Sequence, residues 1–223
     1  MENIEILKRT LSKNGHEIIL VEQAKKENIP LTAHGSQLTV LIIGVVHGDE
    51  PQGKFLIENY LQNTESKSKN RLLFIPCLNP DGLENNTRSN SNGVDINRNF
   101  PTKNWGGGDC EVTSNFYGGE SPASEIETKF ILEIMKEYSP DVILTLHSPY
   151  RVVNYDGPAK ETAEKIGQIM GYPVSSDIGY STPGSFGTYA GVERNIPIIT
   201  LELDDKISIY NLILPIKQLF EEI

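Results

Sequence analysis

The chain has 223 residues, of which 38% are hydrophobic and 22% charged, and its formal net charge is −10. This length and composition predict one globular domain spanning residues 1–223. The negative charge, and a sequence without a block of basic residues, exclude nucleic acid and anionic membranes as expected partners. The first residues lack the apolar core of a signal peptide, no apolar run reaches transmembrane length, and two cysteines make no disulfide framework. We therefore expect a cytoplasmic protein.

The amino-terminal part predicts a helix and then a strand. Apolar residues recur at a helical spacing within residues 1–14, and Gly15 ends that pattern. Residues 16–22 alternate between apolar and polar side chains, which predicts a strand at the edge of a sheet. His16 has no partner nearby that could share a ligand, so we interpret it as a surface residue.

Residues 38–50 are the centre of the pattern. Their apolar, β-branched run predicts a fully buried strand, and a tight turn then presents His47 and Glu50. Pro51 suits the first position of a helix, which we predict over residues 51–61. In open α/β sheets, ligands bind outside the carboxyl ends of the strands. These two side chains are predicted to lie at such an end.

Strands and helices alternate over the rest of the chain. We predict buried strands at 71–78, 141–146 and 196–203, a further short strand at 151–155, and helices at 121–138, 159–170 and 207–221. Residues 83–119 have little periodic pattern but many directed polar side chains, which indicates a functional segment. The order of elements predicts a three-layer α/β/α fold around a mixed, largely parallel, twisted sheet.

Three ionisable side chains stand at or near the ends of predicted strands: His47, His147 and Glu202. A catalytic zinc site needs three protein ligands and one open position, and His47, Glu50 and His147 supply two imidazoles and a carboxylate. Such a site lowers the pKa of a water molecule to about 7 and polarises a carbonyl oxygen. Glu202 lies in an otherwise apolar strand, where a carboxylate is costly unless it has a task. We interpret it as the general base for the zinc-activated water and the proton donor to the leaving nitrogen.

Five motifs occur in one order over residues 44–203. They are His47–Glu50 (HGDE), Asn79–Gly82 (NPDG), Asp95–Pro101 (DINRNFP), His147–Ser148 and Leu201–Glu202. Together they resemble the zinc metallocarboxypeptidases of the carboxypeptidase A superfamily. Within it, the run from Asn79 to Pro101 and residues 155–158 are most similar to the murein peptide amidases. The resemblance implies a compact, cytoplasmic enzyme that hydrolyses the γ-D-glutamyl–meso-diaminopimelate bond of cell-wall peptides during recycling.

The resemblance also implies which residues form the metal site. His47, Glu50 and His147 resemble the ligands of one zinc ion per chain. Asp95 matches the carboxylate that orients the first zinc histidine, a role expected beside a metal-bound imidazole. Glu202 matches the catalytic glutamate.

Further residues match substrate-binding positions of the superfamily. Asn97 and Arg98 match the pair that binds the free carboxylate of a small peptide substrate, for which a planar guanidinium is suited. Arg88 matches the cation that polarises the scissile carbonyl and stabilises the tetrahedral oxyanion. Tyr180 stands at the family's interval before the catalytic glutamate and matches the tyrosine that covers the substrate. Tyr189 is the alternative.

The side-chain pocket for the substrate is expected near Ser185–Thr188. There, Phe186 and Gly187 provide no acid of the kind that selects lysine or arginine. A pocket for diaminopimelate needs both an acceptor and a donor, because the far end of this residue carries an ammonium and a carboxylate. The open candidates are Asp156, Asp109 and Arg151.

Three other functions stay open at this point. One is a general metallocarboxypeptidase that removes C-terminal residues from L-peptides. Another is a deacylase of the aspartoacylase and succinylglutamate desuccinylase branch, which shares the H-x-x-E…H core, although the NPDG turn and the context of Asn97 and Arg98 favour a peptidase. The third is a zinc-binding module that only recognises peptides, which Glu202 and Arg88 argue against because a pure binder needs neither.

Overall fold

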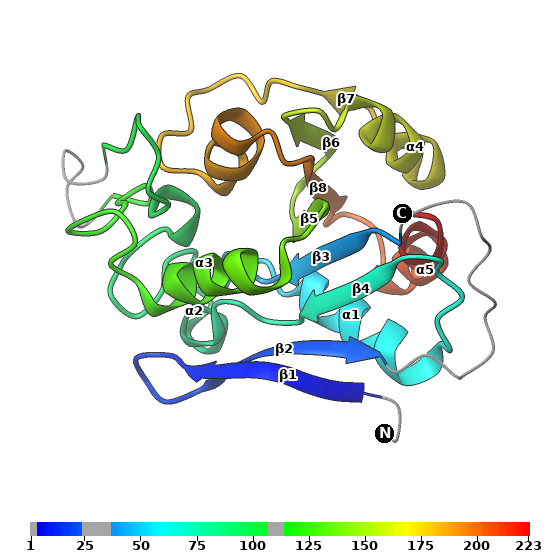
Figure 1. Cartoon of the computed structure of the whole chain (residues 1–223), viewed down its shortest axis with the longest axis horizontal. Coiled ribbons are helices and arrows are strands. Elements are labelled where there is room, and N and C mark those ends of the chain that lie inside the picture. The colour runs from blue at the N-terminus through cyan, green and yellow to red at the C-terminus, as the bar shows by residue number, and fades with distance from the viewer. Residues whose placement is uncertain (1–3, 24–36, 107–113) are drawn as a thin grey trace.

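The computed structural model describes residues 4–23, 37–106 and 114–223. In this part of the chain, eight strands form one sheet in the order β1-β2-β4-β3-β5-β8-β6-β7 (Figure 1). The strands are β1 (Ile4–Leu11), β2 (Glu17–Gln23), β3 (Thr39–Gly44), β4 (Arg71–Ile75), β5 (Val142–His147), β6 (Tyr150–Asp156), β7 (Val174–Ser175) and β8 (Ile198–Asp204). The neighbours β4, β3, β5 and β8 run parallel, whereas the pairs β1–β2, β2–β4 and β6–β8 are antiparallel. The sheet is therefore mixed and parallel at its centre, as predicted.

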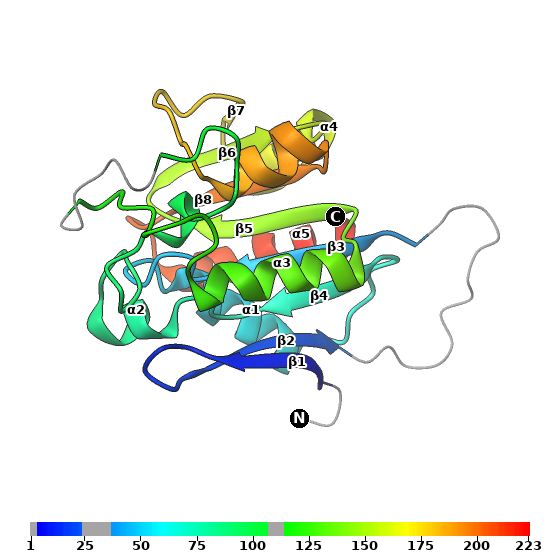
Figure 2. The same cartoon turned by 60° about the vertical axis from the view of Figure 1, so that its left-hand side comes forward.

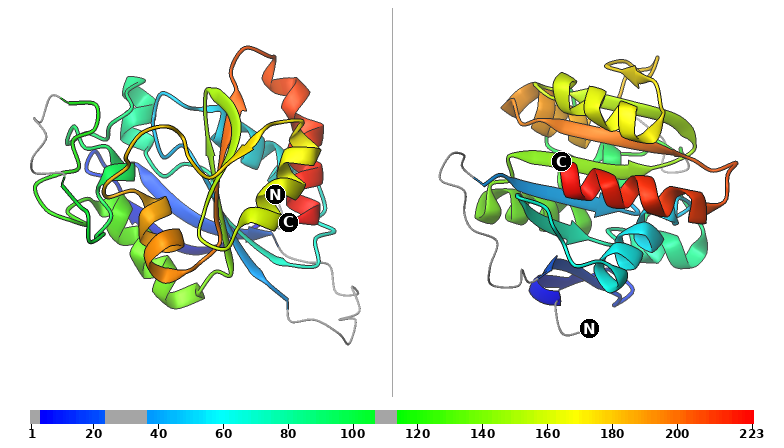
Figure 3. Two further views of the ribbon diagram at one scale, coloured as in Figure 1. Left: turned by 90° about the horizontal axis from the view of Figure 1, so that it is seen from above. Right: turned by 90° about the vertical axis from the view of Figure 1, so that its right-hand side faces the viewer.

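Helices cover both faces of this sheet (Figure 2). The longer ones are α1 (Gln52–Asn63), α3 (Ile126–Tyr138), α4 (Lys160–Met170) and α5 (Ile213–Glu222), and the short ones are α2 (Pro80–Asn85), η1 (Ile96–Arg98), η3 (Gly187–Val192) and η4 (Ile209–Leu212). The right-hand view of Figure 3 shows α1, α4 and α5 across one face, and α3 packs on the other. None of the helices described is long and apolar enough to cross a membrane.

Alternate residues of β3 enter two separate cores. Val40 and Ile42 pack with the face covered by α1, α4 and α5, whereas Leu41 and Ile43 pack with the face covered by α3. Successive side chains of a strand point to opposite faces, so a strand covered on both sides must be apolar throughout. This explains the continuous apolar run and confirms the predicted three-layer α/β/α arrangement.

The amino-terminal segment is a strand, and the helix predicted for it was wrong. Its pairing register with β2 shifts between Ile6 and Lys8, as at a β-bulge. A bulge inserts one residue into the alternation of a strand. Residues 4, 7, 8 and 10 are consequently the half-buried ones, a spacing that imitates a helix. β1 is the edge strand, and β2, predicted to be at the edge, lies inside the sheet.

Some other boundaries also differ from the prediction. Helix α3 begins at Ile126 rather than at residue 121, because Asn99 uses the preceding backbone: its carbonyl accepts from Ala123 N at 2.7 Å, and its Nδ2 donates to Ser121 O at 3.1 Å. Between residues 172 and 192, where no helix or strand was predicted, the structure contains β7 and η3. The C-terminal helix is divided into η4 and α5.

Candidate active site

The turn after β3 is held by a close approach to the turn after β4. A Cβ on Gly48 would collide with the backbone of Gly82, so only glycine fits there. Asn79 caps α2 by accepting from Gly82 N at 2.9 Å, and its Nδ2 donates to Arg88 O at 3.3 Å. The NPDG motif therefore supports both the His47–Glu50 turn and the start of the loop that carries Arg88.

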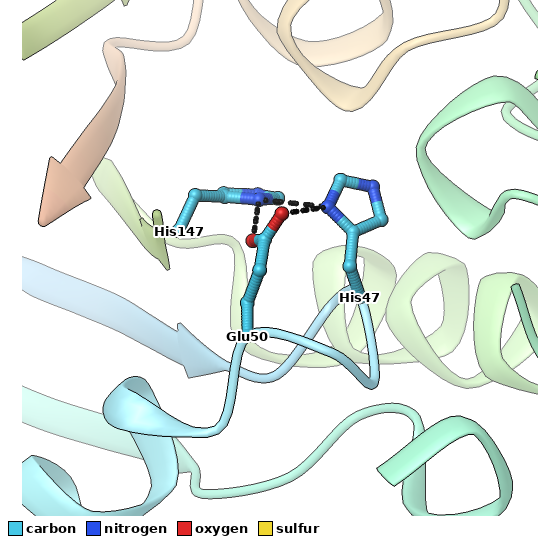
Figure 4. Close-up of side chains that lie close together, drawn as sticks. All are labelled: His47, Glu50 and His147. Carbon is cyan, nitrogen blue, oxygen red and sulfur yellow. Dashed lines mark hydrogen bonds and ion pairs between the residues drawn. The ribbon is translucent and has the colours of Figure 1, made fainter. Parts of the chain in front are cut away.

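The three predicted metal ligands converge at the carboxyl ends of β3 and β5 (Figure 4). Nδ1 of His47 lies 2.8 Å from one carboxylate oxygen of Glu50, and Nδ1 of His147 lies 2.8 Å from the other. The two Nδ1 atoms are 3.2 Å apart. Two nitrogen ligands at about 2.0–2.1 Å from a tetrahedral zinc ion are about 3.3 Å apart. The donor set and its spacing fit one zinc ion.

Asp95 supports this group from behind His47. Its Oδ1 lies 3.2 Å from His47 Nε2, and its Oδ2 accepts from Nε and Nη2 of Arg88 at 3.1 and 2.9 Å. Burial opposes ionisation of Asp95, but His47 and Arg88 hold its pKa well below the usual range. Burial likewise lowers the pKa of His47, but the carboxylates of Asp95 and Glu50 outweigh this and raise it to about 9. The carboxylates of Asp95 and Glu50 therefore favour a positive charge at the position of His47, and a metal cation needs such an environment.

Glu202 lies on β8 directly beside the metal-binding group, because it pairs in parallel register with His147. Its Oε2 is buried and has no hydrogen-bond partner among the residues described. Burial raises the pKa of Glu202; the His147 imidazole opposes the shift, and Glu50 adds to it. An unpartnered carboxylate oxygen next to the metal-binding group can accept a proton.

Three basic or amide side chains face the same pocket, whose volume is about 610 Å³. Nη1 of Arg88 lies 3.2 Å from His47 Nδ1, and Nη1 of Arg98 donates to Asn97 O at 2.8 Å. The side-chain oxygen of Asn97 accepts from Phe186 N at 2.9 Å, so its NH₂ group stays available as a donor. Burial and the charge of Arg88 lower the pKa of Arg98, against the effect of Asp95. This part of the pocket suits a carboxylate.

Comparison with known proteins agrees with this geometry. Residues 4–168 match the zinc carboxypeptidase family, which is well over half of the chain. The chain belongs to the zinc carboxypeptidase family. It is thus a zinc-dependent peptidase, and the predicted family, fold and cofactor are confirmed.

Two murein amidases are similar to this zinc carboxypeptidase. Murein peptide amidase A of Escherichia coli K12 is 33% identical over 171 residues, which cover 73% of this chain and 69% of that protein. The crystal structure of murein-tripeptide amidase from Escherichia coli O157 has a TM-score of 0.80 and 27% identity, covering 98% of this chain and 92% of that one. Carboxypeptidase A of Helicoverpa armigera shares the fold, with a TM-score of 0.72 and 19% identity over 98% of this chain and 66% of that one.

The two candidate tyrosines of the zinc carboxypeptidase lie in different places. Tyr180 lines the pocket and raises the pKa of Arg98, against the larger effect of burial. Tyr189 packs instead on the ring of Phe100, at a centroid distance of 5.7 Å, and beneath the guanidinium of Arg194. Of the two tyrosines, Tyr180 is the one that lines the pocket.

Phe116 is a pocket residue that sequence reasoning missed. Its ring centroid lies 5.6 Å from Cζ of Arg88 and 5.4 Å from Cζ of Arg98, and the residue is 48% exposed. The signal available was an aromatic pair, Phe116 and Tyr117, in a polar, glycine-rich segment. The sequence offers no means of placing it over two arginines that precede it by 18 or more residues.

The structure also separates the three candidates for the side-chain pocket. Asp156 lines it. Arg151 points elsewhere, with Nε 3.8 Å from Asp204 Oδ2 and its guanidinium over the ring of Tyr172. Asp109 lies outside the residues that the structure describes.

Proposed function

We propose that this zinc carboxypeptidase hydrolyses the γ-D-glutamyl–meso-diaminopimelate amide bond of small murein peptides. The observation that carries the proposal is that one pocket is lined both by the zinc-type ligand set and by the side chains of Arg88, Asn97 and Arg98. The likeness to a murein-tripeptide amidase over nearly the whole of both chains supports this substrate. The bond's leaving group, diaminopimelate, keeps a free α-carboxylate, which the pocket is suited to bind.

In this proposal, His47, Glu50 and His147 hold the metal through two Nδ1 atoms and a carboxylate. A zinc ion held there would polarise a carbonyl oxygen and would lower the pKa of a water molecule to about 7. Asp95 orients the His47 ring through Nε2, so that Nδ1 faces Glu50 and His147, the other residues that would hold the metal.

Glu202 moves the protons. It takes one from the attacking water and gives it to the amide nitrogen as the bond breaks. Its buried, unpartnered Oε2 supports this role, because that oxygen has no competing hydrogen bond within the described structure. The raised pKa lets the carboxylate retain the proton until the nitrogen accepts it.

The remaining residues bind and orient the substrate. Asn97 and Arg98 bind the α-carboxylate of the leaving residue, and Tyr180 covers it from the pocket rim. Arg88 is held by Asp95 through Nε and Nη2, which directs its Nη1 towards the metal site. This N–H group stabilises the oxyanion that forms on the scissile carbonyl.

A general carboxypeptidase acting on L-peptides is the second candidate. A chemical argument keeps it in view: Asn97 and Arg98, if they bind the terminal carboxylate, do so independently of how the preceding residue is linked. The wall peptide and an ordinary peptide differ on the other side of the scissile bond.

The deciding experiment incubates the zinc-loaded protein with L-Ala-γ-D-Glu-meso-diaminopimelate and measures released diaminopimelate by mass spectrometry. We expect release, no cleavage of the α-linked isomer, and no release by the Glu202→Gln variant. Trimming of ordinary peptides alone would favour the general carboxypeptidase. Inactivity on both would leave the deacylase or a zinc-binding recognition module.

Two further expectations belong to this proposal. We propose that residues 1–223 form one catalytic domain, since all strands described join one sheet; a single unfolding transition followed by two probes would test this. We also propose a cytoplasmic location, which the resemblance to murein peptide amidases supports. Cell fractionation would test it.

A further inference from the structure

The two histidines of the metal site are supported differently by the rest of the protein. His47 contacts Asp95 through Nε2. His147 makes its polar contacts within the described residues through Nδ1, which faces Glu50 and His47, and makes none there through Nε2 (Figure 4). A neutral imidazole that gives the lone pair of Nδ1 to a metal carries its proton on Nε2. The Nε2–H group of His147 therefore needs an acceptor.

A small internal cavity adjoins the ring of His147. Its volume is about 10 Å³, and most of the side chains around it are apolar. The polar side chains that line it, besides His147, are those of Asn97, Thr145 and Thr200. A cavity of this size holds one water molecule when its wall offers that molecule two to four polar partners. The composition of the lining meets this condition.

Strand register places the two threonines beside the metal site. Thr145 on β5 pairs with Thr200 on β8, and His147 pairs with Glu202 two residues further along the same strands. Residues two apart on a strand face the same side of the sheet. The threonine pair therefore lies on the face that carries His147 and Glu202. Thr145 also interrupts the apolar run Val142–Leu146, in which a hydrophobic residue would be expected.

The hydroxyl group of Thr145 has only long hydrogen bonds to the protein. Thr145 is 3% exposed, and its Oγ1 lies 3.4 Å from Ile199 O and 3.3 Å from Thr200 Oγ1. Hydrogen bonds between oxygen atoms are usually about 2.5–3.0 Å long. A buried hydroxyl group is costly unless it is well bonded. Valine has nearly the same shape and avoids this cost, so we infer that the hydroxyl group has a task.

We propose that Thr145 and Thr200 are positioning residues for His147. They hold one water molecule in the cavity by accepting its hydrogen bonds, and the water oxygen accepts from Nε2–H of His147. The ring then presents Nδ1 to the metal, as the contact with Asp95 makes the ring of His47 do. The water is a neutral acceptor, whereas Asp95 is a charged one. This proposal concerns the zinc site itself and does not depend on which peptide is cleaved.

The test measures zinc affinity by competition with a chromophoric chelator at fixed pH. Thr145→Val and Thr200→Val remove the hydroxyl groups and nearly keep the side-chain shape. The double variant should bind zinc about 10- to 100-fold more weakly than the wild-type protein. Thr145→Ser keeps the hydroxyl group and should bind zinc as the wild-type protein does. The matched control is Thr128→Val on α3, at a buried threonine whose Oγ1 has no partner among the described residues, and it should leave zinc affinity unchanged.

A crystal structure of the zinc-loaded wild-type protein provides a readout that does not require any variant to fold. It should show an ordered water molecule about 3 Å from Nε2 of His147 and from at least one threonine Oγ1. A cavity without this water, or Nε2 bound to another group, would overturn the proposal.

The affinity measurements can refute it separately. Urea unfolding of the metal-free proteins identifies variants that are folded, and unchanged zinc affinity in a folded double variant would overturn the proposal. An equal loss of affinity in Thr128→Val would do the same, because it would show a general effect of losing a buried hydroxyl group. If zinc binds as expected but wall peptides are not cleaved, the proposed function fails and the role of the two threonines stands.

Discussion

Glu127 is a buried carboxylate that helps to shape the loop carrying the anion-binding residues. It lies in the first turn of α3 and is 2% exposed. Nδ2 of Asn90 donates to Glu127 at 3.2 Å and to Glu125 at 2.8 Å, while Oδ1 of Asn90 accepts from two N–H groups of its own loop. This loop joins Arg88 to Asp95, so the charge on Glu127 bears on the stability of the active site.

Burial raises the pKa of Glu127 from 4.5 to about 7; Asn90 opposes the shift, and the carboxylates of Glu125 and Asp81 add to it. At pH values below the unfolded pKa, both folded and unfolded chains hold the proton. As the pH rises towards 7, the unfolded chain ionises while the folded protein keeps its proton, so this group lowers the free energy of unfolding. At about 1.4 kcal/mol per pKa unit, the loss is about 3 kcal/mol by pH 8.

Glu127→Gln removes the ionisation but keeps an oxygen that can accept from Asn90. We therefore compare the free energies of unfolding of the variant and the wild-type protein, measured by urea unfolding of metal-free samples. The difference in favour of the variant should increase by about 2–3 kcal/mol from pH 5 to pH 8. The control is Glu133→Gln on the same helix, a carboxylate whose side chain is 63% exposed, and its effect should stay within about 0.5 kcal/mol at both pH values. An equal difference between Glu127→Gln and wild type at both pH values would refute the reasoning.

The other predictions concern the active site. Glu202→Gln should lower kcat by about 10²- to 10⁴-fold while zinc content, measured by atomic absorption, is unchanged; normal turnover would exclude Glu202 as the base. Removing zinc with a chelator should abolish peptide hydrolysis and adding zinc should restore it, and a rate that does not respond would contradict a metal mechanism. Arg98→Ala should raise KM for substrates with a free carboxylate by about 10- to 100-fold, with little effect on amidated ones; equal losses would place the carboxylate-binding group elsewhere. Phe116→Ala should raise KM by about 2- to 30-fold, because it uncovers the two arginines. Phe116→Tyr keeps an aromatic ring and should have the wild-type KM. An unchanged KM in Phe116→Ala would show that the ring has no role in substrate binding.

Patterns within short stretches of sequence predicted much of this structure. The β3 run could be recognised because a strand covered on both faces must be apolar at every position. The HGDE turn after β3 and the parallel pairing of β3 with β5 then bring His47, Glu50 and His147 together, as the sequence motifs indicated. Helix α4 likewise ends where Gly171 adopts a left-handed conformation, with φ of +67°.

Errors arose where pairing with a distant segment overrides the local pattern. β1 shows helical spacing because its register against β2 shifts in the middle of the strand. Helix α3 starts late because Asn99, more than 20 residues earlier, binds the backbone that precedes it. Neither partner is visible from the segment itself.

The sequence by itself determined the family, the layered fold and the residue types of a zinc site, because zinc ligation and burial between two helix layers each restrict the residues allowed at short spacings. Only the tertiary structure decided how the substrate pocket is lined. Phe116 lies over Arg88 and Arg98, and Asp156 lies beneath Gly187. These contacts depend on strand register and loop path between residues far apart in the chain, which no local pattern records.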